Sequence, residues 1–146
     1  MKLPHDSFVV VADGEKMLFF RNEGDEEHPN LQVERKRSQD NPANSELKAN
    51  RSGHVGNSGS PGGSSYQDTD FHQLAEDRFA SETADLLKKR ALNNDFDKLV
   101  IVAPPRTLGE LRKHYHSEVE KRLVGEIDKD LTGHPVAEIE KIIANA

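Results

Sequence analysis

The residues that could bring a backbone close to RNA gather in one segment, residues 38–67. This segment is poor in apolar side chains, holds half of the glycines, contains the pair Gly62-Gly63 and ends at Gln67. Adjacent glycines allow close approach of the backbone to a ligand and conformations closed to other residues. A connection of this length inside one domain is usually either a working loop or a disordered one. The composition by itself favours a long flexible Gly/Ser/Asn linker, and a ligand-binding loop stays the alternative.

Basic residues lie just before this segment and within it, and they could neutralise phosphate groups. They are Arg35, Lys36, Arg37, Lys48 and Arg51. The run of three at 35–37 also fits an exposed edge strand, in which charge prevents pairing with other strands, and the pattern favours that interpretation.

Arg106 is a separate candidate, because it follows Pro104-Pro105 at the end of an apolar segment. Open α/β sheets often place ligand contacts at the carboxyl ends of their strands. The pattern favours the alternative, in which Arg106 anchors the turn that follows the strand.

Three carboxylates, Asp13, Asp128 and Asp130, could gather metal ions that activate water, as in a nuclease. Turn and capping roles explain the same residues, and the sequence favours those roles. His114 and His116 are two residues apart, so on one helix they would point in different directions and could not share a metal. The chain has no cysteine, which excludes disulfides and thiolate metal sites. We therefore expect no cofactor.

Length and charge limit the class of protein. The chain has 146 residues, which predicts one domain, 1–146, with a substantial core. A net charge of −6 argues against a surface that binds phosphates over its whole extent, but it is compatible with a local basic patch. No apolar run has the length of a signal peptide or a membrane span. We expect a cytoplasmic protein without membrane insertion.

The pattern of apolar residues predicts a single α/β domain. Residues 7–12, 15–21 and 31–37 read as a three-stranded meander, with Asp13-Gly14 as a tight turn that needs positive φ. Residues 98–103 form a continuous apolar run, which is typical of a buried central strand. The remaining elements are a helix from Asp68 or Asp70 to about Asn93, short helices at 108–114 and after a Ser117 cap, a strand at 123–127, and a helix from about Pro135. Together they predict a mixed sheet packed with helices.

Several motifs resemble those of the bacterial host attachment protein family, over nearly the whole chain. They are Val9 to Gly14, the glycine-rich loop, Phe79-Ala80, Leu99 to Gly109 and Glu126 to Thr132. The order of elements also resembles the middle domain of archaeal and eukaryotic class I release factors. In those factors a loop carries Gly-Gly-Gln, which enters the ribosomal peptidyl transferase centre and positions water against the peptidyl-tRNA ester.

The corresponding segment here has the glycine pair but lacks the adjacent glutamine. Ser64 follows Gly63, and Gln67 comes four residues after the pair. The resemblance therefore implies a host attachment family protein that binds ribosome or tRNA without catalysis. The alternative is an indirect regulator of host-cell attachment that acts through protein partners. A peptidyl-tRNA hydrolase or a metal-dependent nuclease is less favoured.

Overall fold

A computed structural model describes residues 1–38 and 61–146, with side chains for 1–38 and 71–146. The elements run β1(Phe8–Ala12), β2(Lys16–Asn22), β3(Leu31–Ser38), α2(Pro61–Leu92), β4(Leu99–Val102), α3(Pro105–Arg112), α4(Ser117–Arg122), β5(Leu123–Ile127) and α5(Val136–Ala144). The five strands form one sheet in the order β3-β2-β1-β4-β5. The α/β class, the meander and the mixed sheet are confirmed, because β1–β2 and β2–β3 are antiparallel whereas β1–β4 and β4–β5 are parallel.

The β1–β2 hairpin closes in a different way from the expected turn. No glycine in the described ranges has a positive φ, so a turn of that type at Asp13-Gly14 is wrong. Instead, Asp13 Oδ1 accepts hydrogen bonds from the backbone N–H groups of Glu15 and Lys16, at 2.7 and 2.6 Å. A carboxylate that bonds the backbone two and three residues later closes a turn without left-handed residues.

Every residue of β4 is buried, as its continuous apolar sequence predicts. Its place in the sheet differs from the expected one. The middle strand is β1, with two strands on each side, and β4 is its parallel neighbour. Both strands read as apolar runs because both lie inside the sheet and both faces are covered.

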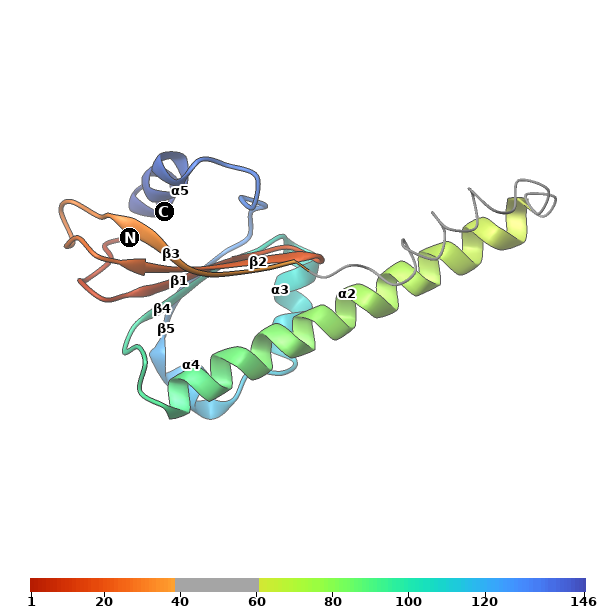
Figure 1. The fold of residues 1–146 in the computed structure, drawn as a ribbon, viewed down its shortest axis with the longest axis horizontal. Coiled ribbons are helices and arrows are strands. Elements are labelled where there is room, and N and C mark those ends of the chain that lie inside the picture. Colours follow the sequence, from red (N-terminus) through yellow and green to blue (C-terminus); the bar gives the residue numbers. More distant parts are fainter. Residues whose placement is uncertain (39–60) are drawn as a thin grey trace.

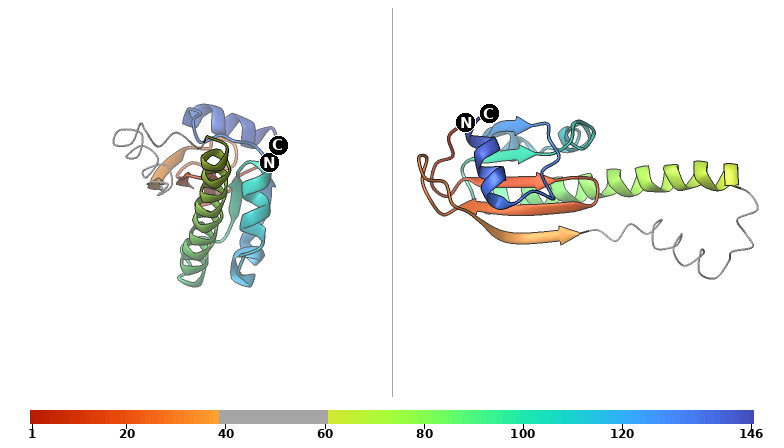
Figure 2. Two further views of the ribbon diagram at one scale, coloured as in Figure 1. Left: turned by 90° about the vertical axis from the view of Figure 1, so that its right-hand side faces the viewer. Right: turned by 90° about the horizontal axis from the view of Figure 1, so that it is seen from above.

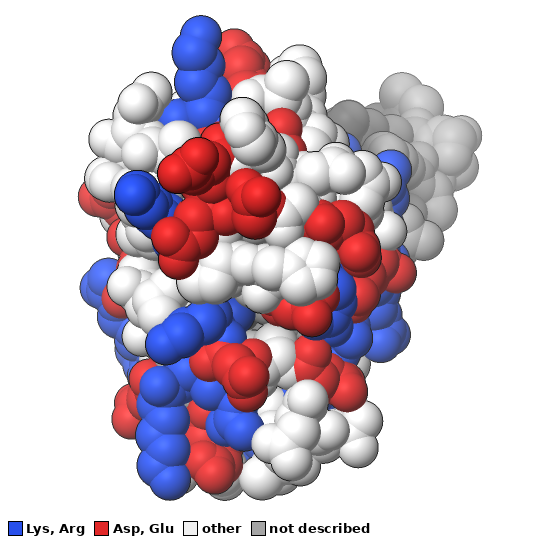
Figure 3. Space-filling model, turned by 90° about the vertical axis from the view of Figure 1, so that its left-hand side faces the viewer, with Lys and Arg blue, Asp and Glu red and all other residues white. Residues whose placement is uncertain are grey.

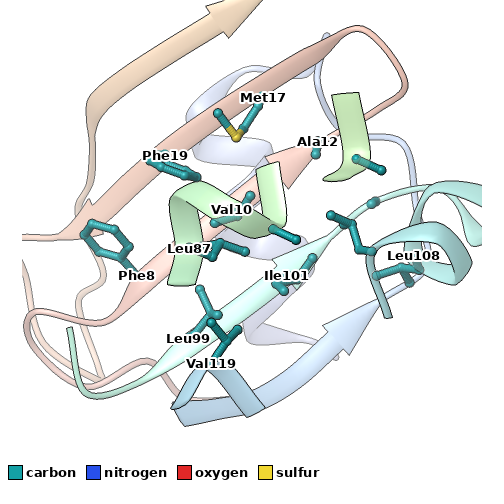
Figure 4. Close-up of a cluster of buried hydrophobic side chains, with 14 of the residues drawn as sticks. Phe8, Val10, Ala12, Met17, Phe19, Leu87, Leu99, Ile101, Leu108 and Val119 are labelled. Carbon is teal, nitrogen blue, oxygen red and sulfur yellow. The ribbon is translucent and has the colours of Figure 1, made fainter. Parts of the chain in front are cut away.

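Helices cover both faces of the sheet (Figures 1 and 2). The face under α2, α3 and α4 holds the larger core cluster (Figure 4), which includes Phe8, Val10, Met17, Phe19, Phe79, Leu87, Leu99, Ile101, Leu108 and Val119. The face under α5 holds a second cluster, which includes Val9, Val11, Phe20, Val100, Val102, Ile139 and Ile143. Alternate residues of β1 enter opposite clusters because successive side chains of a strand point to opposite faces.

Helix α2 is longer than the sequence pattern predicts. It begins at Pro61 and not at Asp68 or Asp70, so residues 61–67 are helical and the expected loop of residues 38–67 is wrong at that end. Proline suits the first turn of a helix, since its missing N–H would have no partner there and its φ is preset for the helix. Residues 39–60, and with them the rest of the linker prediction, lie outside the described residues.

One helix cap differs from expectation. His116, and not Ser117, caps α4, because its Nδ1 accepts a hydrogen bond from the N–H of Glu118 at 3.0 Å. Helix α5 begins where expected, with Pro135 as its cap residue. None of the helices in the described ranges is long and apolar enough to cross a membrane.

Candidate functional site

Gly62 and Gly63 lie in the first turn of α2, at the end of the helix that projects beyond the sheet (Figures 1 and 2). Ala75 is the first buried residue of α2 among those with described side chains. At 1.5 Å per residue, the glycine pair stands roughly 20 Å from Ala75 along the helix axis. Gln67 lies one turn after Gly63 on the same helix. The structure thus carries the glycines on a helix end that is separate from the core.

The three basic residues of β3, residues 35–37, have two different roles in the structure. β3 is an edge strand, as expected, and its pairing with β2 is irregular at Glu34. Arg35 and Lys36 are exposed and have no ion-pair partner among the described residues. Arg37 instead forms an ion pair with Glu82 of α2, and its guanidinium carbon lies 5.3 Å from the centroid of the Phe79 ring. Arg37 therefore holds β3 to α2, and only its two neighbours remain available to a ligand. Arg51 lies outside the described residues.

The structure separates Arg106 from the glycine pair. Arg106 is exposed in the first turn of α3 and lines a shallow depression between α2 and α3 that reaches α2 at Gln73 and Glu76. Roughly 15 Å of helix lies between Gly62 and Gln73. The depression has a volume of about 10 Å³, which suits one water and no cofactor. The candidate residues therefore do not form one cluster.

Three sequence motifs meet at one edge of the sheet, where the parallel strands β1, β4 and β5 end. Asp13 follows β1, Pro104 follows β4, and Asp128 follows β5. Thr132 Oγ1 lies 2.9 Å from Asp13 Oδ2 and 3.0 Å from Asp130 Oδ1. The hydroxyl has one proton, so it donates to one carboxylate at a time. Within residues 1–38 and 61–146 no group of three or more His, Asp or Glu residues could hold a metal ion.

A protein-family model matches most of the chain. The family model described as bacterial archaeo-eukaryotic release factor family 12 matches residues 6–143. The chain belongs to this family. No curated protein matches it. The release-factor relationship expected from the order of elements is confirmed, whereas the link to host attachment stays a prediction.

An ion-pair cluster fixes the carboxyl end of α2 to the sheet in this family 12 protein. Glu34 accepts hydrogen bonds from Arg21 at 2.5 Å and from Arg90 at 3.0 Å. Both guanidinium carbons lie 4.5 Å from the centroid of the Phe8 ring. Burial alone would raise the pKa of Glu34, but the hydrogen bonds and charges of the two arginines outweigh burial and lower it. Asp95 also has a lowered pKa, chiefly because Arg90 donates a hydrogen bond to it.

Glu126, the first residue of the last motif, has a structural role in the family 12 chain. It accepts a hydrogen bond from Tyr115 Oη at 2.8 Å and from Arg112 Nε at 3.1 Å. Burial and the bond to Glu126 raise the pKa of Tyr115. These contacts tie β5 to α3 and to the turn before α4.

One feature of α2 in this family 12 protein was not predicted from the sequence. Phe71, Leu74 and Arg78 are exposed, and Phe71 lies one turn before Ala75, the first buried residue described in the helix. We call these three residues the outer face of α2. The available signal was their spacing of three and four residues, which places them on neighbouring turns of the helix.

Proposed function

We propose that this family 12 protein binds the ribosome or tRNA through the projecting end of α2 and does not hydrolyse peptidyl-tRNA. The observation that carries the proposal is the position of Gly62 and Gly63 in the first turn of a long helix that extends beyond the sheet. Glycines allow the backbone to approach RNA closely. The amino end of a helix also carries a partial positive charge, which favours phosphate.

The absence of glutamine after the glycine pair supports binding without catalysis. Ser64 occupies that position. Its hydroxyl has a shorter reach than a glutamine amide, so it is poorly suited to orient water against the peptidyl-tRNA ester. Gln67 lies one helical turn from Gly63, about 6 Å along the axis, and so does not take the adjacent position.

The distribution of charge disfavours RNA contact at the end of the molecule opposite to the projecting part of α2. At the opposite end of the molecule, acidic and basic side chains are interspersed, and no broad basic surface is seen there (Figure 3). The β2–β3 connection at that end carries exposed Glu23, Asp25, Glu26 and Glu27. Like charge would repel this end from phosphates. Arg35 and Lys36 of β3 would add two phosphate contacts nearer to α2.

Co-sedimentation with bacterial ribosomes across a salt series tests this proposal. We expect saturable binding that weakens as salt rises and falls strongly when Gly62 and Gly63 are both replaced by alanine. Gly109→Ala is the matched control, because Gly109 lies in helix α3 and an added Cβ would meet nothing within 4 Å. A released peptide should not appear when peptidyl-tRNA is present on the ribosomes.

Failure to sediment with ribosomes even at low salt would overturn the proposal. The protein would then be an interaction protein whose partners are proteins, as an indirect role in host attachment requires. Binding to ribosomes would also favour a cytoplasmic location.

A further inference from the structure

The outer face of α2 has an apolar pair that the fold does not use. Phe71 is 52% exposed and Leu74 is 59% exposed. Of the Phe and Tyr residues with described side chains, Phe71 is the one that is exposed. Single exposed apolar residues are normal on proteins, but here two lie one turn apart on a helix that projects from the body. Their side chains are therefore available to a partner.

An unpaired cation completes this face. Arg78 lies one turn after Leu74, is exposed, and has no ion-pair partner among the described residues. The acids that follow on the same side of the helix are already neutralised. Glu82 pairs with Arg37, and Asp85 pairs with Lys89 at 3.0 Å. The outer face therefore offers an aromatic ring together with a cation that has no ion-pair partner among the described residues.

This combination suits single-stranded nucleic acid better than a protein groove. A helix that enters an apolar groove presents apolar anchors at positions i, i+3 and i+7. In this helix the third position is Arg78 instead of an apolar residue. Proteins bind single-stranded nucleic acid through aromatic rings, on which the bases stack, and through cations that contact the phosphate backbone.

We infer that the outer face of α2 binds an unpaired stretch of RNA, with a base stacked on Phe71 and a phosphate at Arg78. This inference rests on the proposed function for RNA as the ligand. It adds that the RNA is single-stranded and names the residues that recognise it. An intact duplex keeps its bases stacked on each other, so Phe71 has no base face to contact in it.

Tryptophan fluorescence tests the stacking directly, because the chain has no tryptophan. Phe71→Trp places an indole at the proposed stacking position. We expect short single-stranded oligouridylate to quench its fluorescence, and the same strand annealed to oligoadenylate to leave it unchanged. Leu92→Trp is the control, since Leu92 is 54% exposed at the other end of α2. Equal quenching by the duplex, or equal quenching in the control, would overturn the inference.

Affinity for the same oligouridylate, measured by fluorescence anisotropy, tests the energetic role. Phe71→Ala should weaken binding by roughly 5- to 100-fold. Arg78→Ala should weaken binding and reduce the slope of log affinity against log salt by about 1. Lys88→Ala is the charge control, because Lys88 is also exposed on α2 and lacks an ion pair among the described residues. Unchanged affinity in Phe71→Ala, or no RNA binding at low salt, would contradict the inference and direct the search to protein partners.

Ribosome sedimentation distinguishes this inference from the proposed function. If ribosome binding needs the glycine pair but is unchanged in Phe71→Ala, the inference fails and the proposed function stands. If Phe71→Trp is quenched by single-stranded RNA but the protein does not pellet with ribosomes, the proposed function fails and the inference stands.

Discussion

Thr132 and Asp13 form a hydrogen bond of 2.9 Å between residues that are 119 positions apart in the chain. The bond joins the turn after β1 to the segment after β5, at the edge where the parallel strands end. It connects the first and the last of the motifs that carry the family resemblance. These motifs therefore include contacts that hold the sheet edge together.

Replacing Thr132 with valine should lower the free energy of unfolding by about 1 kcal/mol, because one hydrogen bond is lost and the shape is kept. Asp13→Ala should lower the free energy of unfolding by a larger amount, since the N–H groups of Glu15 and Lys16 also lose their acceptor. Urea unfolding measures both. Equal stability of Thr132→Val and the wild type would mean that the bond contributes nothing in solution.

The ion pairs of Glu34 with Arg21 and Arg90 predict that the protein loses stability in acid. The pKa of Glu34 is lowered in the folded protein, so its contribution is present above the usual glutamate value of 4.5 and is lost as the pH falls below it. Glu34→Gln should lower the free energy of unfolding by about 1 kcal/mol at neutral pH, as expected for partly exposed ion pairs. The difference from the wild type should shrink in acid.

Urea midpoints between pH 3 and pH 7 check this dependence. Glu27→Gln is the control, because Glu27 is exposed and its carboxylate has no ion pair among the described residues. A constant difference between wild type and Glu34→Gln at all pH values would rule out ionisation of Glu34 as the cause.

The cap of α4 predicts unequal effects at two adjacent positions. His116→Ala should destabilise the protein by about 1 kcal/mol, because the N–H of Glu118 loses its acceptor. His116→Asn should keep most of the stability, since asparagine is a good cap residue. Ser117→Ala should have little effect, as Ser117 is inside the helix. Thermal unfolding of the three variants would show the reverse order if Ser117 were the cap.

Asn94 has a positive φ of 57° just after α2, a conformation that asparagine tolerates and β-branched residues do not. Asn94→Val should therefore destabilise the protein by roughly 1–2 kcal/mol or more. Asn94→Gly should be close to neutral, because relief at φ offsets the lost bond from Arg122 Nη2 to Asn94 Oδ1 at 2.9 Å. Equal urea midpoints for the two variants would exclude backbone strain at this position.

Alanine at Gly62 and Gly63 should leave the melting temperature of the protein within a few degrees of the wild type. Each change favours the helix by up to about 1 kcal/mol. That gain stays local, because the first buried side chain described in α2 is Ala75. Slower hydrogen exchange at the start of α2 should accompany it. A fall of several degrees would show that these positions are not helical.

Local pattern was sufficient to predict most of the elements. The apolar runs of β1 and β4, the charged edge strand β3 and the buried stripe of α2 all record how strongly each residue is shielded from water. The start of α2 was misplaced because an aspartate cap and a proline in the first turn are both valid start signals. The sequence alone does not rank Pro61 against Asp68.

Residue type and spacing by themselves determined the fold class, the order of the elements and the glycine pair with its missing glutamine. Tertiary structure decided that β1 is the middle strand, that Arg37 is engaged by Glu82, and that Thr132 reaches Asp13. It also decided that Phe71 and Leu74 stay exposed. The physical reason is that periodicity reports burial within a segment, whereas strand neighbours and ion-pair partners depend on contacts between residues far apart in the chain.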